Sequence, residues 1–365
     1  MTMRIIFTVS NDLSYDQRMH RICHSLASNH FDVMLVGRTR RHSIPLTTKA
    51  FRQKRLSCVS QKGFLFYAEY NVRLFLFLLF QKKYDAICSI DLDTLPAGFL
   101  ASILRQKKRV FDAHEYFSEV PEVVNRPMVK SFWEMIARRI LPHYKHAYTV
   151  GKHLAAIFEQ AYQVPFQVVR NAAVLSEHKP DNHTSSQKIL LYQGALNEGR
   201  GLEATIEAMQ YLDGITLVLV GEGDLSTKLR ALTDDLQLGD KVVFKGFMEP
   251  IQLKVVTQQA WLGINLLENR GLSYYYSLAN KFFDYVQAGV PILTMDFPEY
   301  KALNQEHEVA YLLSEPKPEL IAIAIRNMLF EPNYYEKLQQ NCLVARNFWN
   351  WSQEEITLLR IWSSI

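Results

Sequence analysis

The same rhythm of short apolar runs and helical stretches occurs twice along the chain, and it restricts the fold more strongly than any other feature. Runs rich in β-branched and aromatic residues, such as residues 3–10 (MRIIFTVS) and 32–38 (DVMLVGR), alternate with stretches whose apolar residues have helical spacing. After residue 187 the alternation starts again with KILLYQGA. Alternating strands and helices favour parallel sheets, so we predict an α/β protein of two doubly wound, Rossmann-like domains.

The polar stretch SEHKPDNHTSSQ separates the two series and predicts an interdomain linker at residues 176–187. The first domain then covers residues 1–175, and the second covers residues 188–348. Residues 349–365 have apolar positions at helical spacing and a Ser-x-x-Glu capping box, so we expect a terminal helix that packs back on the first domain. Ligands of doubly wound sheets bind at the carboxyl ends of the strands, and we expect two such ends to face each other across a cleft.

Three classes of protein are disfavoured. The four cysteines are scattered, without a CxxC pair or zinc-ligand spacing, so we expect neither a disulfide framework nor a structural metal, in keeping with a reducing cytoplasm. The first apolar run is one strand long and does not resemble an export signal. It is followed by SNDLSYDQR instead of Gly-x-Gly-x-x-Gly, which argues against a nicotinamide dinucleotide site.

The net charge of +4 conceals an asymmetry between the two halves. Residues 1–155 contain 24 Lys and Arg against 12 Asp and Glu, and the rest of the chain contains 17 against 25. A basic first half suits an anionic membrane surface or a phosphorylated acceptor. We do not expect a nucleic-acid partner, because the basic residues are dispersed and form no recognisable nucleic-acid motif.

The most membrane-like segment is residues 72–80 (VRLFLFLLF). It has about half of the ~20 residues that a spanning helix needs, and we expect that it does not cross a bilayer. A buried core helix is the favoured interpretation. The alternative is a helix that lies in a membrane interface, which would make the protein peripheral on the inner face of the cell membrane.

Five short motifs follow one another in the second half: Tyr192-Gln193-Gly194, Arg200-Gly201-Leu202, Gly221-Glu222-Gly223, Lys245-Gly246-Phe247, and residues 274–285 (YYYSLANKFFDY) followed by VQAGVPIL. In order and spacing they resemble the retaining glycosyltransferases of family four, which have the GT-B fold. In the first half, DLDTLPAG and FDAHEYFSEVPE resemble the acceptor-side loops of bacterial members. The resemblance therefore spans nearly the whole chain.

The resemblance implies a nucleoside diphosphate sugar of the UDP or GDP type as co-substrate, and no metal cofactor. It implies catalytic roles for His114, Arg200 and Lys281. The donor-binding residues that it implies are Gly194, Glu222, Gly246, Phe247, Tyr276, Ser277, Leu278, Asn280 and Asp284.

Physical chemistry gives reasons for the donor residues. Asn280 and Lys281 begin a predicted helix, where unpaired backbone amides and the positive dipole end favour a diphosphate. Lys281 and Arg200 add formal charge that can stabilise a departing nucleoside diphosphate. Asp284 lies one turn further along the same face and can accept both ribose hydroxyls. The backbone at Gly246 can hydrogen-bond the edge of the base.

The resemblance also implies that His114 lies close to the reacting sugar carbon, where it can hydrogen-bond a donor hydroxyl, and it implies further candidates on the acceptor side. The other candidates can bind acceptor hydroxyls or only shape and cap their loops: Asp16, Arg18, Asp93, Glu115 and Glu119. Asp91-Leu92-Asp93 has the spacing of a metal-binding Asp-x-Asp pair, but it lies in the wrong half of the chain. Members with the resembling fold stabilise the leaving group with protein cations and helix dipoles, so we expect no metal there.

Two positions depart from the family pattern. Tyr276 stands where the family commonly has a glutamate, and Ala195 stands where many members have an arginine. With these exceptions noted, we predict transfer of a hexose to a glycan or lipid-linked acceptor in bacterial surface polysaccharide synthesis, with the anomeric configuration retained. The alternatives are a non-catalytic nucleotide- or glycan-binding subunit and a nucleotide-sugar epimerase.

Overall fold

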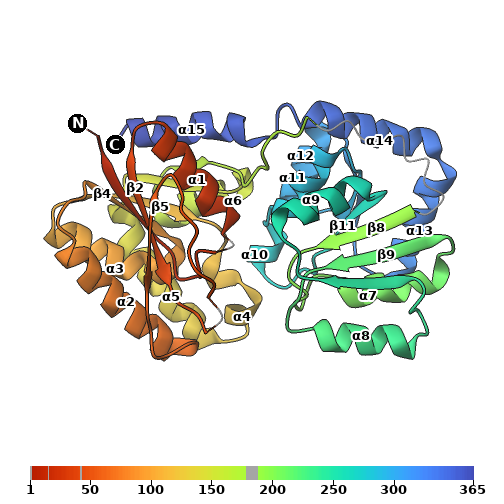
Figure 1. Ribbon diagram of the computed structural model, residues 1–365, viewed down its shortest axis with the longest axis horizontal. Coiled ribbons are helices and arrows are strands. Elements are labelled where there is room, and N and C mark those ends of the chain that lie inside the picture. Colours follow the sequence, from red (N-terminus) through yellow and green to blue (C-terminus); the bar gives the residue numbers. More distant parts are fainter. Residues whose placement is uncertain (1, 15, 42, 178–187) are drawn as a thin grey trace. The chain divides into compact units, whose positions relative to one another are not determined.

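The structure is a computed structural model that describes residues 2–14, 16–41, 43–177 and 188–365 (Figure 1). The chain divides into two compact units. The first unit comprises the residues up to Arg170 together with Glu354–Ile365, and the second unit comprises Asn171–Gln353. The predicted end of the first domain at residue 175 is therefore five residues late, and the final segment joins the first unit at Glu354 instead of residue 349. Most of the predicted linker lies outside the described residues.

The first unit is built on a sheet of seven strands in the order β3-β2-β1-β4-β5-β6-β7. All neighbouring strands are parallel, as the alternating pattern predicted. In chain order the strands are β1 (Arg4–Thr8), β2 (Asp32–Arg38), β3 (Arg52–Leu56), β4 (Ala86–Ile90), β5 (Lys108–Ala113), β6 (His146–Thr149) and β7 (Phe166–Val168). Its helices are α1 (Gln17–Ser28), α2 (Gly63–Phe80), α3 (Asp91–Leu104), α4 (Pro121–Val124), α5 (Pro127–Ile140), α6 (Lys152–Tyr162) and most of α15 (Trp351–Ser363).

The terminal helix α15 completes the core of the first unit, as expected. The Trp362 ring lies 5.2 Å from that of Phe7 in the first strand and is 1% exposed. Arg170 Nε lies 2.7 Å from Glu354 Oε1, and the Arg170 backbone amide donates a hydrogen bond to the other oxygen of the same carboxylate. The ends of the described chain thus contribute to one hydrophobic core.

The second unit has a six-stranded sheet in the order β10-β9-β8-β11-β12-β13, again with only parallel neighbours. Its strands are β8 (Lys188–Gln193), β9 (Ile215–Val220), β10 (Val242–Gly246), β11 (Leu262–Asn265), β12 (Ile292–Met295) and β13 (Ala310–Leu313). Its helices are α7 (Leu202–Ala208), α8 (Ser226–Asp235), α9 (Pro250–Gln259), α10 (Leu272–Tyr275), α11 (Asn280–Ala288), α12 (Pro298–Glu306), α13 (Pro318–Phe330) and α14 (Pro332–Ala345). The prediction of two Rossmann-like domains is confirmed.

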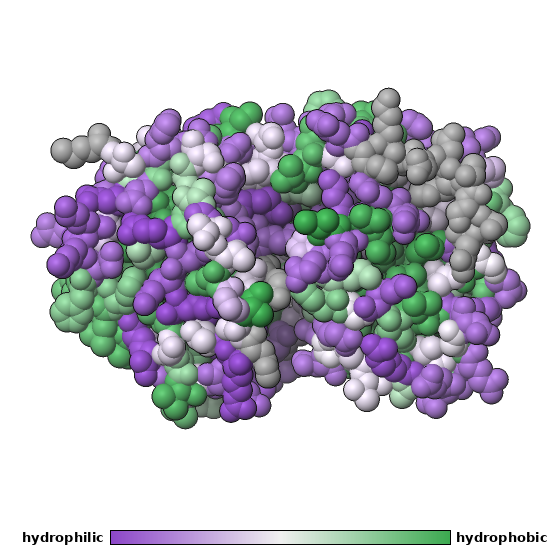
Figure 2. Space-filling model, viewed as in Figure 1, coloured by the Kyte–Doolittle hydropathy of each residue, from purple (hydrophilic) through white to green (hydrophobic). Residues whose placement is uncertain are grey.

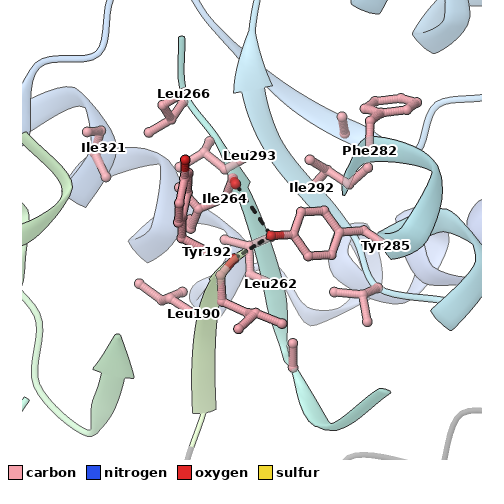
Figure 3. Packing of buried hydrophobic residues seen from close by; sticks show 14 of the residues in the cluster. Leu190, Tyr192, Leu262, Ile264, Leu266, Phe282, Tyr285, Ile292, Leu293 and Ile321 are labelled. Carbon is pink, nitrogen blue, oxygen red and sulfur yellow. Dashed lines mark hydrogen bonds between the residues drawn. The ribbon is translucent and has the colours of Figure 1, made fainter. Parts of the chain in front are cut away.

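Helix α11 is fixed to this sheet by Tyr285, which is fully buried (Figure 3). Its hydroxyl donates a hydrogen bond to the Leu191 carbonyl at 2.8 Å, and the Ile264 carbonyl lies 3.5 Å away. The ring fits because residue 263 is glycine: a Cβ there would lie 2.4 Å from the ring. The buried Tyr285 fixes the rotation of α11 and therefore the direction of the neighbouring Asp284.

Helix α2 corrects one expectation from the sequence. It has 18 residues, so by length and composition it is long enough to cross a membrane, a test that core helices of soluble proteins also pass. The buried side chains form a single stripe, Phe66, Tyr70, Leu74 and Leu78, in the core of the first unit. Only 22% of the helix is buried, so the expected core helix is in large part exposed.

Candidate active site

Three glycine-containing loops meet at the carboxyl ends of β8, β9 and β10. The Gly194 amide donates to the Val220 carbonyl at 2.9 Å, and the Gly221 amide donates to the Gly246 carbonyl at 2.8 Å. Gly221 has a φ of +131°, and a Cβ there would lie 2.0 Å from the Gly194 oxygen. Only glycine permits this approach, so the loops present backbone atoms to a ligand.

Lys281, in the first turn of α11, is a buried cation. It is 8% exposed, and its Nζ lies 3.6 Å from the ring centroid of Tyr192. Among the described residues it has no ion pair with a carboxylate. Burial lowers the pKa of Lys281 well below its usual value; Arg200 lowers it further and Asp284 opposes the shift. A buried ammonium group without a paired carboxylate is poised to gain an anionic ligand.

Arg200 brings a second cation to the same place. Its guanidinium carbon lies 4.8 Å from the ring centroid of Tyr274, and its charge acts on Lys281. Within the described part of the chain, Arg200 Nε and Ser277 Oγ are buried without a hydrogen-bond partner. Buried polar atoms are rarely left unsatisfied, so both atoms point to a ligand that completes the site.

Asp284 is held by a residue to which the sequence gave no role. Gln193 Nε2 donates a hydrogen bond to Asp284 Oδ2 at 3.0 Å, and Thr257 Oγ1 donates to Gln193 Oε1 at 2.7 Å. The chain Thr257–Gln193–Asp284 fixes the carboxylate beside the loop at Gly194. The sequence feature that could have indicated a role for Gln193 is its position at the end of a predicted strand, directly before the loop at Gly194.

Glu222, Gly246 and Phe247 lie together at the ends of β9 and β10. Glu222 Oε1 is 3.5 Å from where a Gly246 Cβ would be, and it forms an exposed ion pair with Arg230 at 3.1 Å. Phe247 is 57% exposed. An exposed ring beside a bare backbone is a suitable surface for a nucleoside base.

The segment before α11 contains the remaining donor candidates. The Tyr276 ring contacts the Tyr275 ring edge to face at 4.9 Å, and Leu278 is buried. Asn280 accepts a hydrogen bond from the side chain of Asn171. Ala279, the residue before the helix, has no capping side chain, so side-chain capping does not block the first turn of α11.

In the first unit, His114 follows β5 and lies among carboxylates. Its Nε2 is 3.0 Å from Asp112 Oδ2, its Nδ1 is 3.9 Å from Asp91 Oδ2, and its backbone amide donates to Asp91 Oδ1 at 2.8 Å. Asp91 has a φ of +54°, in the left-handed region that residues other than glycine adopt infrequently. Burial disfavours the imidazolium, but Asp112 and Asp91 outweigh it and raise the pKa of His114.

Arg18, one of the acceptor candidates, has its partners within the first unit. It is 4% exposed, its NH2 lies 2.9 Å from Asp112 Oδ1, and its NH1 donates to the Val169 carbonyl at 2.8 Å. Arg18 and His114 together outweigh the effect of burial and lower the pKa of Asp112. Arg18 therefore acts on the site through Asp112.

Two further candidates have structural partners. Asp16 caps α1: its Oδ1 accepts from the Met19 amide at 3.0 Å. Glu119 is 7% exposed and forms an ion pair with Lys130. For these two residues the structure gives the capping or loop-shaping role that the sequence left open.

Asp93 and Glu115 differ in exposure. Asp93 is buried and accepts a hydrogen bond from Ser10, and burial raises its pKa to about 6. The two aspartates of the Asp-x-Asp sequence therefore have different partners: Asp91 accepts from the His114 backbone amide, and Asp93 accepts from Ser10. Glu115 is exposed, next to His114.

Comparison with known proteins gives a family match for part of the chain and a fold for the whole of it. A family model described as "Glycosyl transferases group 1" matches residues 175–342. The HepE protein of Anabaena in complex with UDP and glucose has a TM-score of 0.77 at 14% identity, with all of both chains covered. WaaG, a glycosyltransferase involved in lipopolysaccharide biosynthesis, has a TM-score of 0.75 at 17% identity, covering 98% of this chain and 99% of WaaG. No curated protein matches the sequence significantly.

The fold is shared beyond the transferases. A putative UDP-N-acetylglucosamine 2-epimerase from Listeria monocytogenes has a TM-score of 0.64 at 13% identity, covering 98% of this chain and 95% of the other. The structural likeness therefore defines a GT-B fold, and the family match is confined to residues 175–342. The resemblance to the GT-B glycosyltransferases is confirmed: residues 175–342 match the group 1 glycosyl transferase model, and the whole chain has the fold of those enzymes.

Proposed function

We propose that this protein is a glycosyltransferase that transfers a hexose from a nucleoside diphosphate sugar to a glycan or lipid-linked acceptor and retains the anomeric configuration. One observation carries the proposal. Lys281, a buried cation without a carboxylate ion pair among the described residues, stands in the first turn of α11 near Arg200 and Asp284. This set suits a diphosphate next to a ribose.

In the proposed reaction, the ammonium group, the guanidinium group and the amides of α11 stabilise charge on the departing diphosphate. Protein cations then take the place of a divalent metal. The acceptor hydroxyl attacks from the face that the diphosphate leaves, and a phosphate oxygen takes its proton. The contribution of the enzyme is positioning and charge stabilisation.

His114 is proposed to hold the transferred sugar. Asp112 accepts from Nε2, which leaves Nδ1 to donate to a sugar hydroxyl when the ring is protonated. Arg18 keeps Asp112 ionised and in place. His114 is then the residue that contacts the sugar, and Asp112 and Arg18 are positioning residues.

UDP is the first donor nucleotide to test, because the similar HepE structure contains UDP. A role in bacterial surface polysaccharide synthesis in the cytoplasm is proposed from the sequence, and the likeness to WaaG is consistent with it.

The decisive experiment measures the thermal stabilisation of the protein by UDP, GDP and their sugar conjugates, with and without Mg²⁺. We expect one base to stabilise the protein equally in both conditions. Turnover of the matching sugar nucleotide is then compared between wild type and the charge-removing variants Lys281→Met and Arg200→Met. Near-normal turnover in both variants would contradict the assignment.

The two alternatives make different predictions in the same experiment. A non-catalytic subunit with a site altered at Tyr276 and Ala195 would bind the nucleotide without turning it over. An epimerase would convert the sugar without any acceptor. We keep the epimerase as an alternative because a putative epimerase has the same fold.

A further inference from the structure

Arg38, the last residue of β2, is a half-buried cation that has no ion pair with a carboxylate among the described residues. Its guanidinium carbon lies 3.9 Å from the ring centroid of Phe66, and its NH1 donates a hydrogen bond to the Gln61 carbonyl at 3.0 Å. Its Nε is buried without a hydrogen-bond partner in the described part of the chain, where NH2 has none either. One face and one nitrogen of the guanidinium group are therefore in use, and the edge formed by Nε and NH2 is not.

The edge formed by Nε and NH2 is the one with which an arginine holds a carboxylate or a phosphate through two parallel hydrogen bonds. The same chain shows this geometry at Arg4, whose Nε and NH2 each lie 3.2 Å from one oxygen of the Asp85 carboxylate. Among the described residues, no carboxylate takes the corresponding place at Arg38. A buried donor is rarely left without an acceptor, so this edge points to an anionic ligand.

The charge of Arg38 is not compensated by its surroundings. Burial lowers the pKa of Arg38 and the neighbouring Arg40 lowers it further, and the opposing effects of Asp93 and two other neighbours are smaller. Residues 33–61 hold seven Lys and Arg and no Asp or Glu. Figure 2 shows mainly hydrophilic residues over the part of the first unit where Figure 1 labels β2 and β5. An anion that approaches Arg38 therefore meets net positive charge.

Hydrogen bonds connect Arg38 to the acceptor candidates. Its backbone amide donates to the Asn11 carbonyl at 3.0 Å, and the preceding residue, Ser10, donates a hydrogen bond to Asp93. Asn11 Oδ1 is a second buried atom without a partner among the described residues. The donor edge of Arg38 and the acceptor atom of Asn11 thus belong to adjacent segments at the carboxyl ends of β1 and β2. A sugar that has both an anionic group and hydroxyl groups can satisfy both.

We propose that Arg38 binds an anionic group, a carboxylate or a phosphate, on the sugar of the acceptor, and that Asn11 accepts a hydrogen bond from a hydroxyl of that sugar. The assignment rests on the proposed function, because it names the class of acceptor for that reaction. Arg38 then selects acidic acceptors over neutral ones. A structural role alone, which ties β2 to Gln61 and Phe66, would use NH1 and one face of the guanidinium group and would leave the buried Nε unexplained.

The test is binding of the full chain to a glycan array in the absence of a sugar donor. The array holds pairs of glycans: each member that carries a carboxylate or a phosphate is printed beside its carboxyl-reduced or dephosphorylated counterpart. We expect the wild type to bind the acidic member of at least one pair about tenfold more tightly than the neutral member, as one charge-assisted contact provides. Which pairs show the preference tells whether the anionic group is a carboxylate or a phosphate.

Variants of Arg38 link the preference to this side chain. Arg38→Gln keeps an amide that can donate to the Gln61 carbonyl, and it should weaken binding of the preferred acid about tenfold to a hundredfold without changing that of the neutral counterpart. Arg38→Lys should give an intermediate preference, because it keeps the charge and loses the two-pronged geometry. A structural role would affect both members of a pair equally.

Arg109 provides the matched control. It is also half-buried, its guanidinium carbon lies 5.3 Å from the ring centroid of Phe99, and its NH1 lies 3.3 Å from Ser102 Oγ. It stands at the other end of the sheet, in the first turns of the amino end of β5. Arg109→Gln should therefore bind each pair of glycans like the wild type.

Stabilisation by UDP separates this inference from the proposed function. It should be the same in the wild type and in all three variants, because the proposed nucleotide site lies in the second unit. Loss of UDP binding in the wild type would contradict the proposed function. Equal binding of acidic and neutral members in every pair, no binding to any acidic glycan, or an unchanged preference in Arg38→Gln would each overturn the assignment of Arg38 while leaving the nucleotide site intact.

Discussion

Among the described residues, each unit buries one lysine or arginine near its candidate site, and the two cations differ in what surrounds them. Arg18 in the first unit is paired with Asp112 at 2.9 Å and is 4% exposed. Lys281 in the second unit is 8% exposed, and no ion pair compensates it among the described residues. Burial opposes the charge in both cases, but carboxylates raise the pKa of Arg18, while the pKa of Lys281 falls.

The contrast separates a structural cation from a ligand-binding cation. The charge of Arg18 is already compensated, so it contributes by orienting Asp112 and hence His114. The charge of Lys281 is compensated only when an anion binds. Removing the first should therefore affect stability, and removing the second should affect binding.

The largest effect is expected for Arg18→Met. It removes the guanidinium group paired with the fully buried Asp112 and leaves only His114 beside the carboxylate, and breaking a buried pair in this way costs about 3–5 kcal/mol. Chemical denaturation measures the loss in unfolding free energy. Arg52→Met is the control, because the Arg52–Asp32 pair is exposed and should cost less than ~1 kcal/mol. Equal losses in the two variants would contradict the structural role of Arg18.

Lys281→Met should have the opposite pattern. The dissociation constant for UDP should rise about tenfold to a hundredfold, as expected when a charge-assisted contact is lost. The stability of the free protein should stay the same or increase, because a buried charge without an ion pair is removed. Calorimetric titration with UDP tests the predicted loss of affinity, and thermal unfolding tests the predicted stability. A destabilised variant with normal UDP affinity would make Lys281 a structural residue like Arg18.

The pH dependence sharpens the comparison. The folded pKa of Lys281 lies below its unfolded value, so between the two the unfolded chain binds more protons and this residue makes stability increase with pH. Over the same range UDP affinity should decrease, by up to about tenfold per pH unit for one proton. Both slopes should flatten in Lys281→Met. Parallel slopes in wild type and variant would exclude Lys281 as their source.

The smallest effect is expected for Gln193→Leu. Asp284 stays in place but loses the amide that orients it at 3.0 Å, so UDP affinity should fall about threefold to tenfold. The readout that distinguishes positioning from simple destabilisation is the comparison of UDP with a nucleotide that lacks the 2′-hydroxyl. If Gln193 positions Asp284, the preference for UDP over the nucleotide without the 2′-hydroxyl should be smaller in the variant than in the wild type. If Gln193 only supports the fold, the preference should be unchanged.

The fold was accessible from the sequence because periodicity and strand composition are local. Motif order placed Gly194, Arg200, Gly246 and Lys281 in one unit, and the structure brings their strand ends and the start of α11 together. The positions of these residues depend on local backbone geometry, and short sequence motifs predict that geometry.

The roles of the acceptor candidates were not accessible in the same way. Arg18 and Asp112 are 94 positions apart, and only the tertiary structure makes them a pair. Helix α2 was misjudged for a different reason: apolar residues occur on all of its sides, so its pattern does not distinguish the core-facing side from the outward side.

The division of the first unit into two chain segments has a consequence for synthesis on the ribosome. Residues 354–365 leave the exit tunnel after the whole second unit, so the second unit can fold while the first still lacks α15. Until then the surface that receives Trp362 is uncovered, with Phe7 beneath it. A nascent first unit would be exposed to chaperones and proteases for the time that about half of the chain takes to be translated, and truncation before Glu354 should leave it in that vulnerable state.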